Sequence, residues 1–391
     1  MTAKPVHDET LISEEAPGPS QALSGVLLLA SAAVALLWAN SPWRDGYQAL
    51  WHTPVAGWSL QHVVNDGLMT LFFLLVGLEI KHELQDGALS SWRKAALPVV
   101  GAIGGMLVPA VLYTLVARGT DANAGWGVPM ATDIAFALGV IALLGDRVPA
   151  GLRIFLAALA IADDIGAVLV IALFYTPSVS VPALGVSAAV LGLLLLLNAR
   201  GVGTTWPYVV LGGVLWFAVY RSGIHASIAG VLLSVAIPAR GMDNVQDRLE
   251  SVLQHPVTYG VVPIFALANA GVTFPEQLGG FLTQPAVLGA SIGLVLGKPI
   301  GIVGAAWLAV RLRIAQLPDD ADWARVMGVG ILGGIGFTMS LFIATLAFGE
   351  STQLDAAKVG VFIGSLTTGL AGALVLGRVG SRARRDAVST S

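Results

Sequence analysis

The sequence contains no cysteine among its 391 residues, and its 21 Lys and Arg and 24 Asp and Glu residues amount to only 12% charged residues. The lack of cysteine excludes disulfides, thiolate catalysis and cysteine-based metal or iron–sulfur centres. Soluble domains carry about 25% charged residues, so the scarcity of charge argues against a soluble enzyme. A net charge of −3 without a long basic stripe predicts no nucleic-acid partner.

Hydrophobic residues make up 55% of the chain and gather in runs of about 20, the length of helix that crosses a hydrocarbon core of about 30 Å. We therefore predict an all-α polytopic membrane protein with twelve transmembrane helices. One transmembrane domain over 21–378 would lie between an N-terminal tail, 1–20, and a C-terminal tail, 379–391. The expected spans are 22–39, 60–84, 95–117, 122–143, 150–174, 181–199, 205–219, 222–237, 256–274, 286–310, 326–348 and 357–377.

The distribution of Lys and Arg indicates the orientation. With both termini in the cytoplasm, 16 of the 21 fall on cytoplasmic segments and four, Arg44, Arg118, Arg221 and Lys358, on external ones. This bias follows the positive-inside rule, so we expect cytoplasmic termini. The remaining residue, Lys298, lies in the middle of the tenth span.

Charged residues stand near the midpoints of three predicted spans: Asp133 follows Thr132 in the fourth, Asp163 and Asp164 are in the fifth, and Lys298 is in the tenth. Charges at this depth are costly and usually mark an ion path, although ion pairs that only join helices are the alternative. Adjacent helical residues point about 100° apart, so one aspartate can face a cavity while the other reaches Lys298. Carboxylates and the Thr132 hydroxyl suit a hard monovalent cation, and protons compete for the same oxygens.

Two of the spans contain helix-breaking residues. The fourth, GWGVPMATDIAFALGV, has Pro129 just before Thr132, and the eleventh, GVGILGGIGFTMSLFIA, has a glycine run ending at Gly336 before Thr338. They are the middle members of the triplets three–five and ten–twelve, whose seven-helix offset reverses orientation, so we predict an inverted repeat with two discontinuous helices. Asp133 and Lys298 would offset the partial charges of the broken helix ends.

Glycines in the tenth span recur at every fourth residue, at Gly289, Gly293, Gly297 and Gly301. Such a stripe allows the backbone of another helix to approach closely. We interpret it as a packing surface.

The second span ends in LFFLLVGLEIKHEL, which places Glu79, Lys81, His82 and Glu83 at the cytoplasmic mouth. These charges either flank the membrane or form a titratable cluster that gates entry with pH.

Seven stretches together resemble the NhaA family of bacterial sodium/proton antiporters, a known example of inverted-repeat transporters. The resemblance runs from about Leu23 to Leu376. It implies Na+ or Li+ and H+ as substrates, no cofactor, electrogenic extrusion driven by protons, activation at alkaline pH and residence in the bacterial inner membrane. The stretches are LFFLLVGLEIKHEL, MATDIAFALGVIALLG, LAALAIADDIGAVLVIALFY, SGIHASIAGVLLS, PIFALANAGV, LGKPIGI and GIGFTMSLFIA.

The resemblance also implies residue roles. Asp163 and Asp164 would bind Na+ or Li+, Asp133 with Thr132 would lie at the discontinuous helix, and Lys298 would be the family's tenth-helix lysine. The pH-sensing region maps onto Glu79, Lys81, His82, Glu83 and Glu250.

Two departures from the family stand out. His82 replaces a usual arginine, which bears on the pH dependence. The external stretch TPVAGWSLQHVVNDG is shorter than the usual β-hairpin connection. Whether a homodimer forms through this stretch is therefore an open question.

Three other functions fit parts of the pattern. An intramembrane aspartyl protease would use Asp133 and Asp163 as a catalytic dyad. A cation channel would use the carboxylates for selectivity without coupling to protons. A different cation/proton exchanger, for example one that accepts potassium, is the closest alternative.

Overall fold

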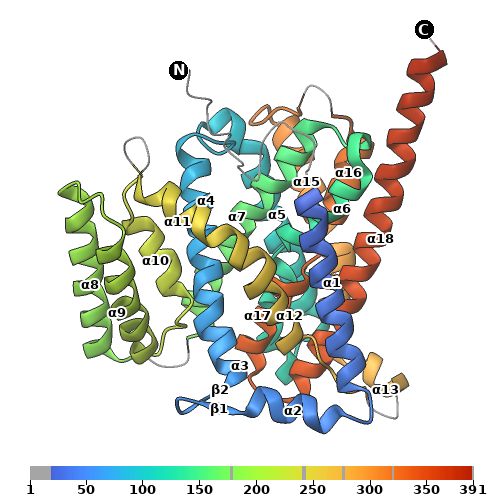
Figure 1. Cartoon of the computed structure of the whole chain (residues 1–391). Coiled ribbons are helices and arrows are strands. Elements are labelled where there is room, and N and C mark those ends of the chain that lie inside the picture. The colour runs from blue at the N-terminus through green and yellow to red at the C-terminus, as the bar shows by residue number, and fades with distance from the viewer. Residues whose placement is uncertain (1–18, 177–178, 240–243, 275–277, 319–320, 390–391) are drawn as a thin grey trace.

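The computed structural model describes residues 19–176, 179–239, 244–274, 278–318 and 321–389, which are predominantly helical (Figure 1). Most of the predicted N-terminal tail, residues 1–18, lies outside the described residues. The first half of the chain forms α1 (Pro19–Ala39), α2 (Arg44–His52), β1 (Pro54–Val55), β2 (Trp58–Ser59), α3 (Leu60–His62), the π-helix η1 (Val63–Leu68), α4 (Met69–Gln85), α5 (Trp92–Val116), the 3₁₀-helix η2 (Asp121–Met130), α6 (Ile134–Leu144), the 3₁₀-helix η3 (Gly145–Arg147) and α7 (Ala150–Phe174).

The second half adds a lateral group of helices and then the second broken helix. Its elements are α8 (Val181–Ala199), α9 (Trp206–Ser222), α10 (Ile228–Ala236), α11 (Val245–Pro256), the π-helix η4 (Val257–Val261), α12 (Val262–Asn269), α13 (Leu278–Leu282), α14 (Pro285–Ile292), the π-helix η5 (Gly293–Gly297), α15 (Lys298–Arg311), α16 (Trp323–Leu332), α17 (Phe337–Phe348) and α18 (Thr352–Ser389). The last helix therefore runs beyond residue 377, where the sequence predicts the end of the last span.

Eight helices in the described part of the chain are long and apolar enough to cross a membrane, and two bent pairs bring the number to ten. The pairs are η2 with α6, bent by 44°, and α16 with α17, bent by 45°. This confirms the polytopic all-α fold and the discontinuous helices predicted for the fourth and eleventh spans. The structure does not confirm the count of twelve.

The difference in count comes from the predicted spans 205–219 and 222–237. The first corresponds to α9, which has 17 residues, and the second to α10, which has nine. At 1.5 Å per residue, α10 is about 14 Å long, too short to cross a hydrocarbon core alone. Gly223, with φ of 86°, ends α9, and the helix does not resume until Ile228.

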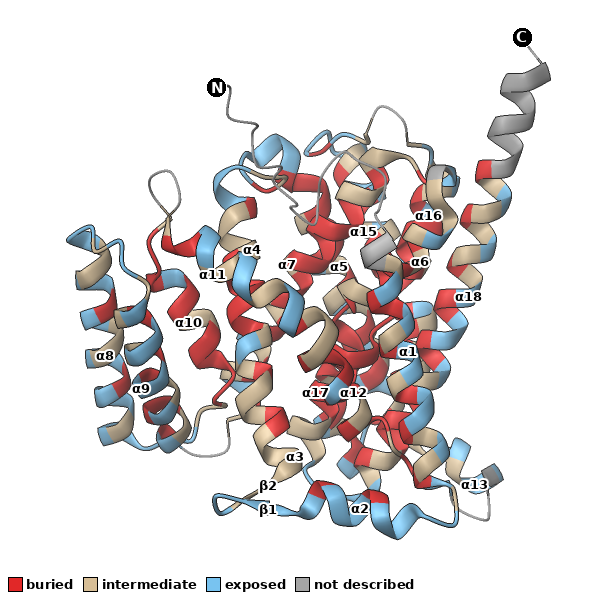
Figure 2. Ribbon diagram, in the orientation of Figure 1, coloured by how far each residue is buried: buried red, intermediate tan, exposed pale blue. Residues whose placement is uncertain are grey.

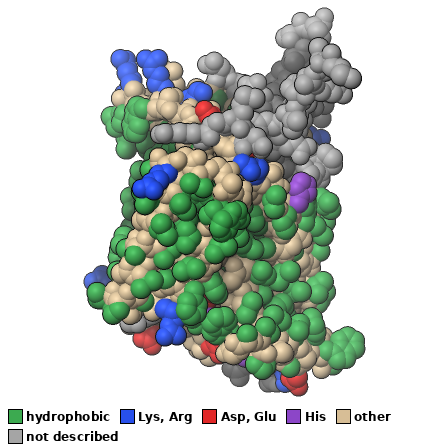
Figure 3. Space-filling model, turned by 60° about the vertical axis from the view of Figure 1, so that its left-hand side comes forward, with side chains coloured by type: hydrophobic (Ala, Val, Ile, Leu, Met, Phe, Trp, Pro, Cys, Tyr) green, Lys and Arg blue, Asp and Glu red, His purple; other side chains and the backbone are tan. Residues whose placement is uncertain are grey.

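The packing divides the molecule into a main body and a lateral group formed by α8, α9 and α10, at the left in Figure 1. A large apolar cluster runs through the main body, and a smaller one joins α4 to the lateral group, through residues such as Leu78, Leu215 and Leu233. Figure 2 shows many buried residues in α7, α12 and α17. In Figure 3, hydrophobic side chains cover most of the middle of one face and charged side chains lie toward its two ends, as a bilayer requires.

The glycine stripe of the tenth span is a packing surface, as the sequence predicts, and its partner in the structure is the third span. A Cβ on Gly301 would lie 2.1 Å from the carbonyl oxygen of Gly104 in α5, and a Cβ on Gly297 would lie 2.6 Å from Cα of Pro109. The α5 and α15 backbones are therefore in contact where they cross. This crossing fixes the position of Lys298, which begins α15 one turn before Gly301.

Candidate ion-binding site

The two helix breaks meet in the interior of the main body. Between η2 and α6 the chain is extended through Ala131 and Asp133, and the Asp133 amide N–H donates to the carbonyl oxygen of Ile335, 2.7 Å away, in the break between α16 and α17. Breaking a helix in a membrane exposes backbone groups that must find partners inside the protein. Here each break supplies a partner to the other.

Asp133 occupies the side of this crossing where two helices begin. Its Oδ1 accepts a hydrogen bond from the Phe136 amide at the start of α6 (2.9 Å), and its Oδ2 accepts from the Thr338 amide at the start of α17 (3.0 Å) and from the Thr338 hydroxyl. The carboxylate is 2% exposed. One negative charge thus faces the positive ends of two helices. At Gly336, the N-cap of α17, a Cβ would lie 2.2 Å from Oγ of Ser340, so a side chain there would require Ser340 to move.

Thr132, Asp163 and Lys298 form a second, directly bonded cluster on the other side. The ammonium of Lys298 donates to Oδ2 of Asp163 and to the Thr132 hydroxyl oxygen, 3.0 Å away. That hydroxyl lies 2.7 Å from Oδ2 of Asp163 and 2.8 Å from the carbonyl oxygen of Gly333 at the C-terminal end of α16. The hydroxyl has one proton, so it donates to one of these two oxygens at a time.

Asp164 is buried beside this cluster and makes no direct contact with Lys298. It is 1% exposed, and its Oδ1, like Oδ1 of Asp163, has no hydrogen-bond partner among the described residues. It lies in the electrostatic field of Asp163, Asp133, Glu79 and Lys298. Buried carboxylate oxygens normally have partners, so these two oxygens are free to bind a proton or a cation.

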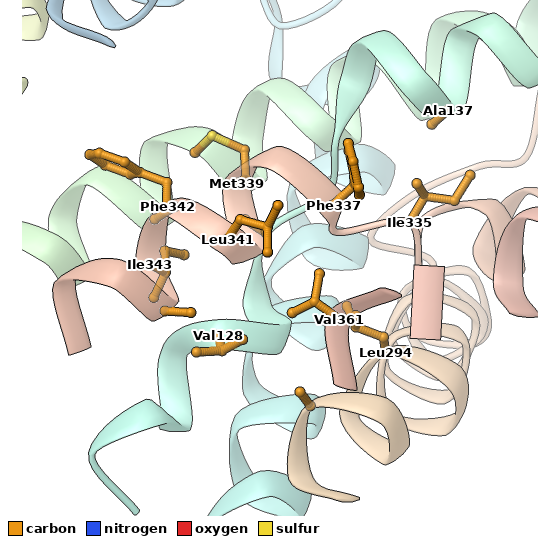
Figure 4. Close-up of a cluster of buried hydrophobic side chains, with 14 of the residues drawn as sticks. Val128, Ala137, Leu294, Ile335, Phe337, Met339, Leu341, Phe342, Ile343 and Val361 are labelled. Carbon is orange, nitrogen blue, oxygen red and sulfur yellow. The ribbon is translucent and has the colours of Figure 1, made fainter. Parts of the chain in front are cut away.

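Apolar side chains close the space around the crossing. Figure 4 shows Val128 of η2, Leu294 of η5 and Val361 of α18 gathered beside Phe337 and Leu341 of α17. These side chains are at most 3% exposed. In such surroundings charges interact more strongly than in water.

Two tyrosines hold the short helix η2 in place just before the chain reaches the break. The Tyr175 hydroxyl donates to the carbonyl oxygen of Ala124 (3.0 Å) and accepts from the Gly127 amide (3.1 Å), while the Tyr113 hydroxyl donates to the carbonyl oxygen of Ala122 (3.0 Å). Burial raises the pKa of Tyr175 to about 12. The hydroxyl therefore keeps its proton, and the bond to Ala124, across the physiological pH range.

The residues predicted at the cytoplasmic mouth separate into two environments. Glu79 lies close enough to Glu83 and Glu250 for their charges to repel it. Glu83 is buried and accepts from the Ala88 amide (2.6 Å). Lys81 instead donates to carbonyl oxygens at the C-terminal end of α10, of Ser234, Val235 and Ile237. The side chain of His82, which is partly exposed, makes no hydrogen bond or ion pair within the described part of the chain.

Other polar clusters escape prediction because each joins at least two residues that are far apart in the sequence. Asp66 lies 3.2 Å from Nδ1 of His62 and 3.8 Å from Nδ1 of His225. Asn65 and Asn269 exchange two side-chain hydrogen bonds, of 2.7 and 3.2 Å, in the buried space between η1 and α12. A polar residue on an otherwise apolar span is the only signal in the sequence, and it does not identify the partner.

Two bent helices that cross around buried carboxylates and a buried lysine define a secondary transporter with discontinuous helices. Comparison with known proteins gives the particular family. The family model described as Na+/H+ antiporter 1 matches residues 18–376. The chain belongs to this family, whose members are secondary transporters and not enzymes.

Several curated relatives share about half of their residues with the chain. The Na(+)/H(+) antiporter NhaA of Rhizobium etli is 50% identical over 367 residues, which cover 91% of this chain and 93% of that protein. The antiporter of the same name from Paramagnetospirillum magneticum is 51% identical over 360 residues, covering 91% and 94%. That of Caulobacter vibrioides is 50% identical over 365 residues, covering 91% and 88%. With the apolar helices, this similarity makes the chain a multi-pass bacterial membrane protein.

Proposed function

We propose that the chain extrudes Na+ or Li+ in exchange for protons that bind to Asp163 and Asp164. The observation that carries the proposal is the buried cluster of Thr132, Asp163 and Lys298 beside the unpaired carboxylate oxygen of Asp164. A cation entering from the cytoplasm displaces protons from the two aspartates, because both ligands need the same oxygens. Alternating access then releases the cation outside, and protons return.

Asp164 is the principal cation ligand in this mechanism, and Asp163 alternates between the cation and Lys298. In the structure Asp163 is engaged with Lys298, whereas Asp164 is not. Binding of a cation by Asp163 requires its ion pair with Lys298 to open, and the second proton then leaves either from Asp163 or from the Lys298 ammonium as the cation enters. If more than one proton enters for each cation, net positive charge moves inward and the membrane potential drives extrusion.

Asp133, Thr338 and Gly336 hold the discontinuous helices at the site. Both oxygens of Asp133 are committed to the starts of α6 and α17. This arrangement argues against an aspartyl protease, since Asp133 and Asp163 would have to share a proton and activate a water. Lys298 bonded to Asp163 also has no role in such a dyad.

Transport by the purified protein in liposomes tests the proposal. With an acid interior reported by a ΔpH dye, external Na+ or Li+ should drive proton efflux, and K+ should not. Clamping the potential with valinomycin and potassium should change the rate of exchange if it is electrogenic. Sodium flux that persists without any proton movement would identify a channel, and equal responses to K+ and Na+ would identify a different exchanger.

The cytoplasmic cluster of Glu79, Glu83 and Glu250, with Lys81 and His82, tunes this exchange with pH. The charge of Glu79 reaches Asp164, so titration at the mouth alters the field at the ion site. The proposed regulation is activation at alkaline pH.

Replacing Glu79 with Gln is expected to shift the onset of activity toward acid pH. The change removes a negative charge that favours the protonated form of Asp164. The measurement is the pH profile of sodium-dependent exchange in vesicles. Asp247→Asn, at an exposed position of α11, is the matched control. A profile for Glu79→Gln that coincides with the control would remove Glu79 from pH regulation.

The proposal places the protein in the inner membrane with both termini in the cytoplasm and the lipid bilayer around its apolar surface. The start of α1 and the end of α18 lie at the same end of the molecule (Figure 1), as this orientation requires. A homodimer would form through the β1–β2 hairpin. That hairpin has two residues in each strand, paired Pro54 with Ser59 and Val55 with Trp58, so each subunit offers a short edge.

A further inference from the structure

A cavity of about 480 Å³ lies at the external end of the proposed orientation, away from the ion site. Its walls come from α2, from the residues around the end of α12, and from the start of α18. None of the residues assigned to ion binding lines it. Its volume is within the range of pockets that hold small ligands.

Lys358 forms the charged part of the inner wall. It is 5% exposed, and within the described part of the chain its ammonium makes no hydrogen bond or ion pair with another residue. Asp355, one turn earlier in α18, attracts it electrostatically without direct contact. The sequence places Lys358 among the external charges, but the structure buries it. A buried ammonium is costly unless acceptor groups surround it, so this cavity favours a ligand with acceptor oxygens.

Trp51 contributes a second donor, from α2. Its side chain is buried, and its indole Nε1 has no hydrogen-bond partner among the described residues. The Tyr47 hydroxyl lies beside this N–H group and interacts with it without the geometry of a full hydrogen bond. The same hydroxyl bonds the carbonyl oxygens of Leu267 and Ala268 and the Gly271 amide. Two donors from separate helices therefore line one cavity, and an oxyanion could accept hydrogen bonds from both.

The same cavity also carries acidic groups. Asp355 is partly exposed, and the side chain of Glu350 is 85% exposed and lies 3.9 Å from Nε2 of His52. A ligand that is only anionic would be repelled by these carboxylates, and a ligand that is only cationic would be repelled by Lys358. A zwitterion with an oxyanion at one end and an ammonium at the other complements both.

We propose that this external cavity binds a phosphoethanolamine group, with its phosphate at Lys358 and Trp51 and its ammonium at Asp355 and Glu350. A phospholipid headgroup is the source that the surroundings favour. On and beside α2, Trp43 is 75% exposed, and Leu50 and Val55 are 37% and 42% exposed. Exposed tryptophan and aliphatic side chains are typical of the membrane interface, where headgroups lie.

Native mass spectrometry of the purified full chain tests the proposal with three lipids of matched acyl chains. Phosphatidylethanolamine should bind at least threefold more tightly than phosphatidylglycerol, which lacks an ammonium, or phosphatidylcholine, whose quaternary ammonium cannot donate hydrogen bonds. Soluble phosphoethanolamine should compete with the bound lipid. Equal binding of the three lipids, or failure of the soluble group to compete, would overturn the assignment to the headgroup.

Variants connect the binding to the cavity. Lys358→Met and the milder Trp51→Phe, which removes only the N–H group and retains an aromatic ring, should each lower binding of phosphatidylethanolamine at least threefold. Arg118→Met, an exposed external charge outside the cavity, should leave it unchanged. Sodium-dependent exchange by each variant reports that the fold is intact. Unchanged lipid binding by a folded Lys358→Met or Trp51→Phe variant would overturn the proposal, whatever the outcome for the ion site.

Discussion

Replacing Asp164 with Asn is expected to reduce sodium-dependent exchange to the level of membranes that lack the protein. Asn has nearly the same shape, so it should fit the buried position, which is 1% exposed. It carries neither a negative charge nor an exchangeable proton at neutral pH. Loss of one charged contact to a desolvated cation costs roughly 2–3 kcal/mol or more, equivalent to about 100-fold weaker binding, and the site also loses a proton carrier.

Everted membrane vesicles with an acid interior and a ΔpH dye provide the measurement. Added Na+ should collapse the gradient in the wild type and not in Asp164→Asn, at equal amounts of protein in the membrane. Asp121→Asn is the matched control, because Asp121 is exposed at the start of η2 and lies outside the ion site. An undiminished response in Asp164→Asn would remove this residue from the ion site and redirect attention to Asp163.

The apolar runs predict most of the fold, because a transmembrane helix needs apolar residues over a length that the thickness of the bilayer sets. Two predicted spans, 150–174 and 181–199, coincide with α7 and α8. The prediction is wrong where a helix is polar: the span expected to begin at residue 256 begins at Val245, with α11. This helix lies against α4 through the Gln246 amide, which donates to the carbonyl oxygen of Leu78 (3.2 Å). Hydropathy does not detect a helix held by such a contact.

The depth of charged residues predicts the centre of the site but not its bonding. Span midpoints bring Thr132, Asp163 and Lys298 to one level, and the structure joins them directly. The bond between Asp133 and Thr338 depends on how two breaks cross, which no local pattern encodes. The burial of Lys358 is missed for a different reason. It lies within the predicted span 357–377, yet a position one residue from a span's end reads equally well as external.

Replacing Gly301 with Ala is expected to destabilise the protein and impair transport together. The added Cβ would lie 2.1 Å from the carbonyl oxygen of Gly104, and that oxygen belongs to a helix backbone, which cannot turn aside as a flexible side chain can. The α5 and α15 helices must therefore separate. Overpacking of this kind typically costs about 1–3 kcal/mol, and sometimes more. Because Lys298 is one turn away on α15, the displacement also moves its ammonium away from Asp163.

Gly304→Ala on the same helix separates this contact from the general effect of adding a methyl group. A Cβ at Gly304 meets no atom within 4 Å, and alanine favours helix more than glycine does. Thermal unfolding of the purified proteins should show a midpoint several degrees lower for Gly301→Ala and an unchanged or higher one for Gly304→Ala. Exchange rates should follow the same order. Equal midpoints would mean that α5 and α15 adjust to a side chain at their crossing, and that the glycine stripe does not position Lys298.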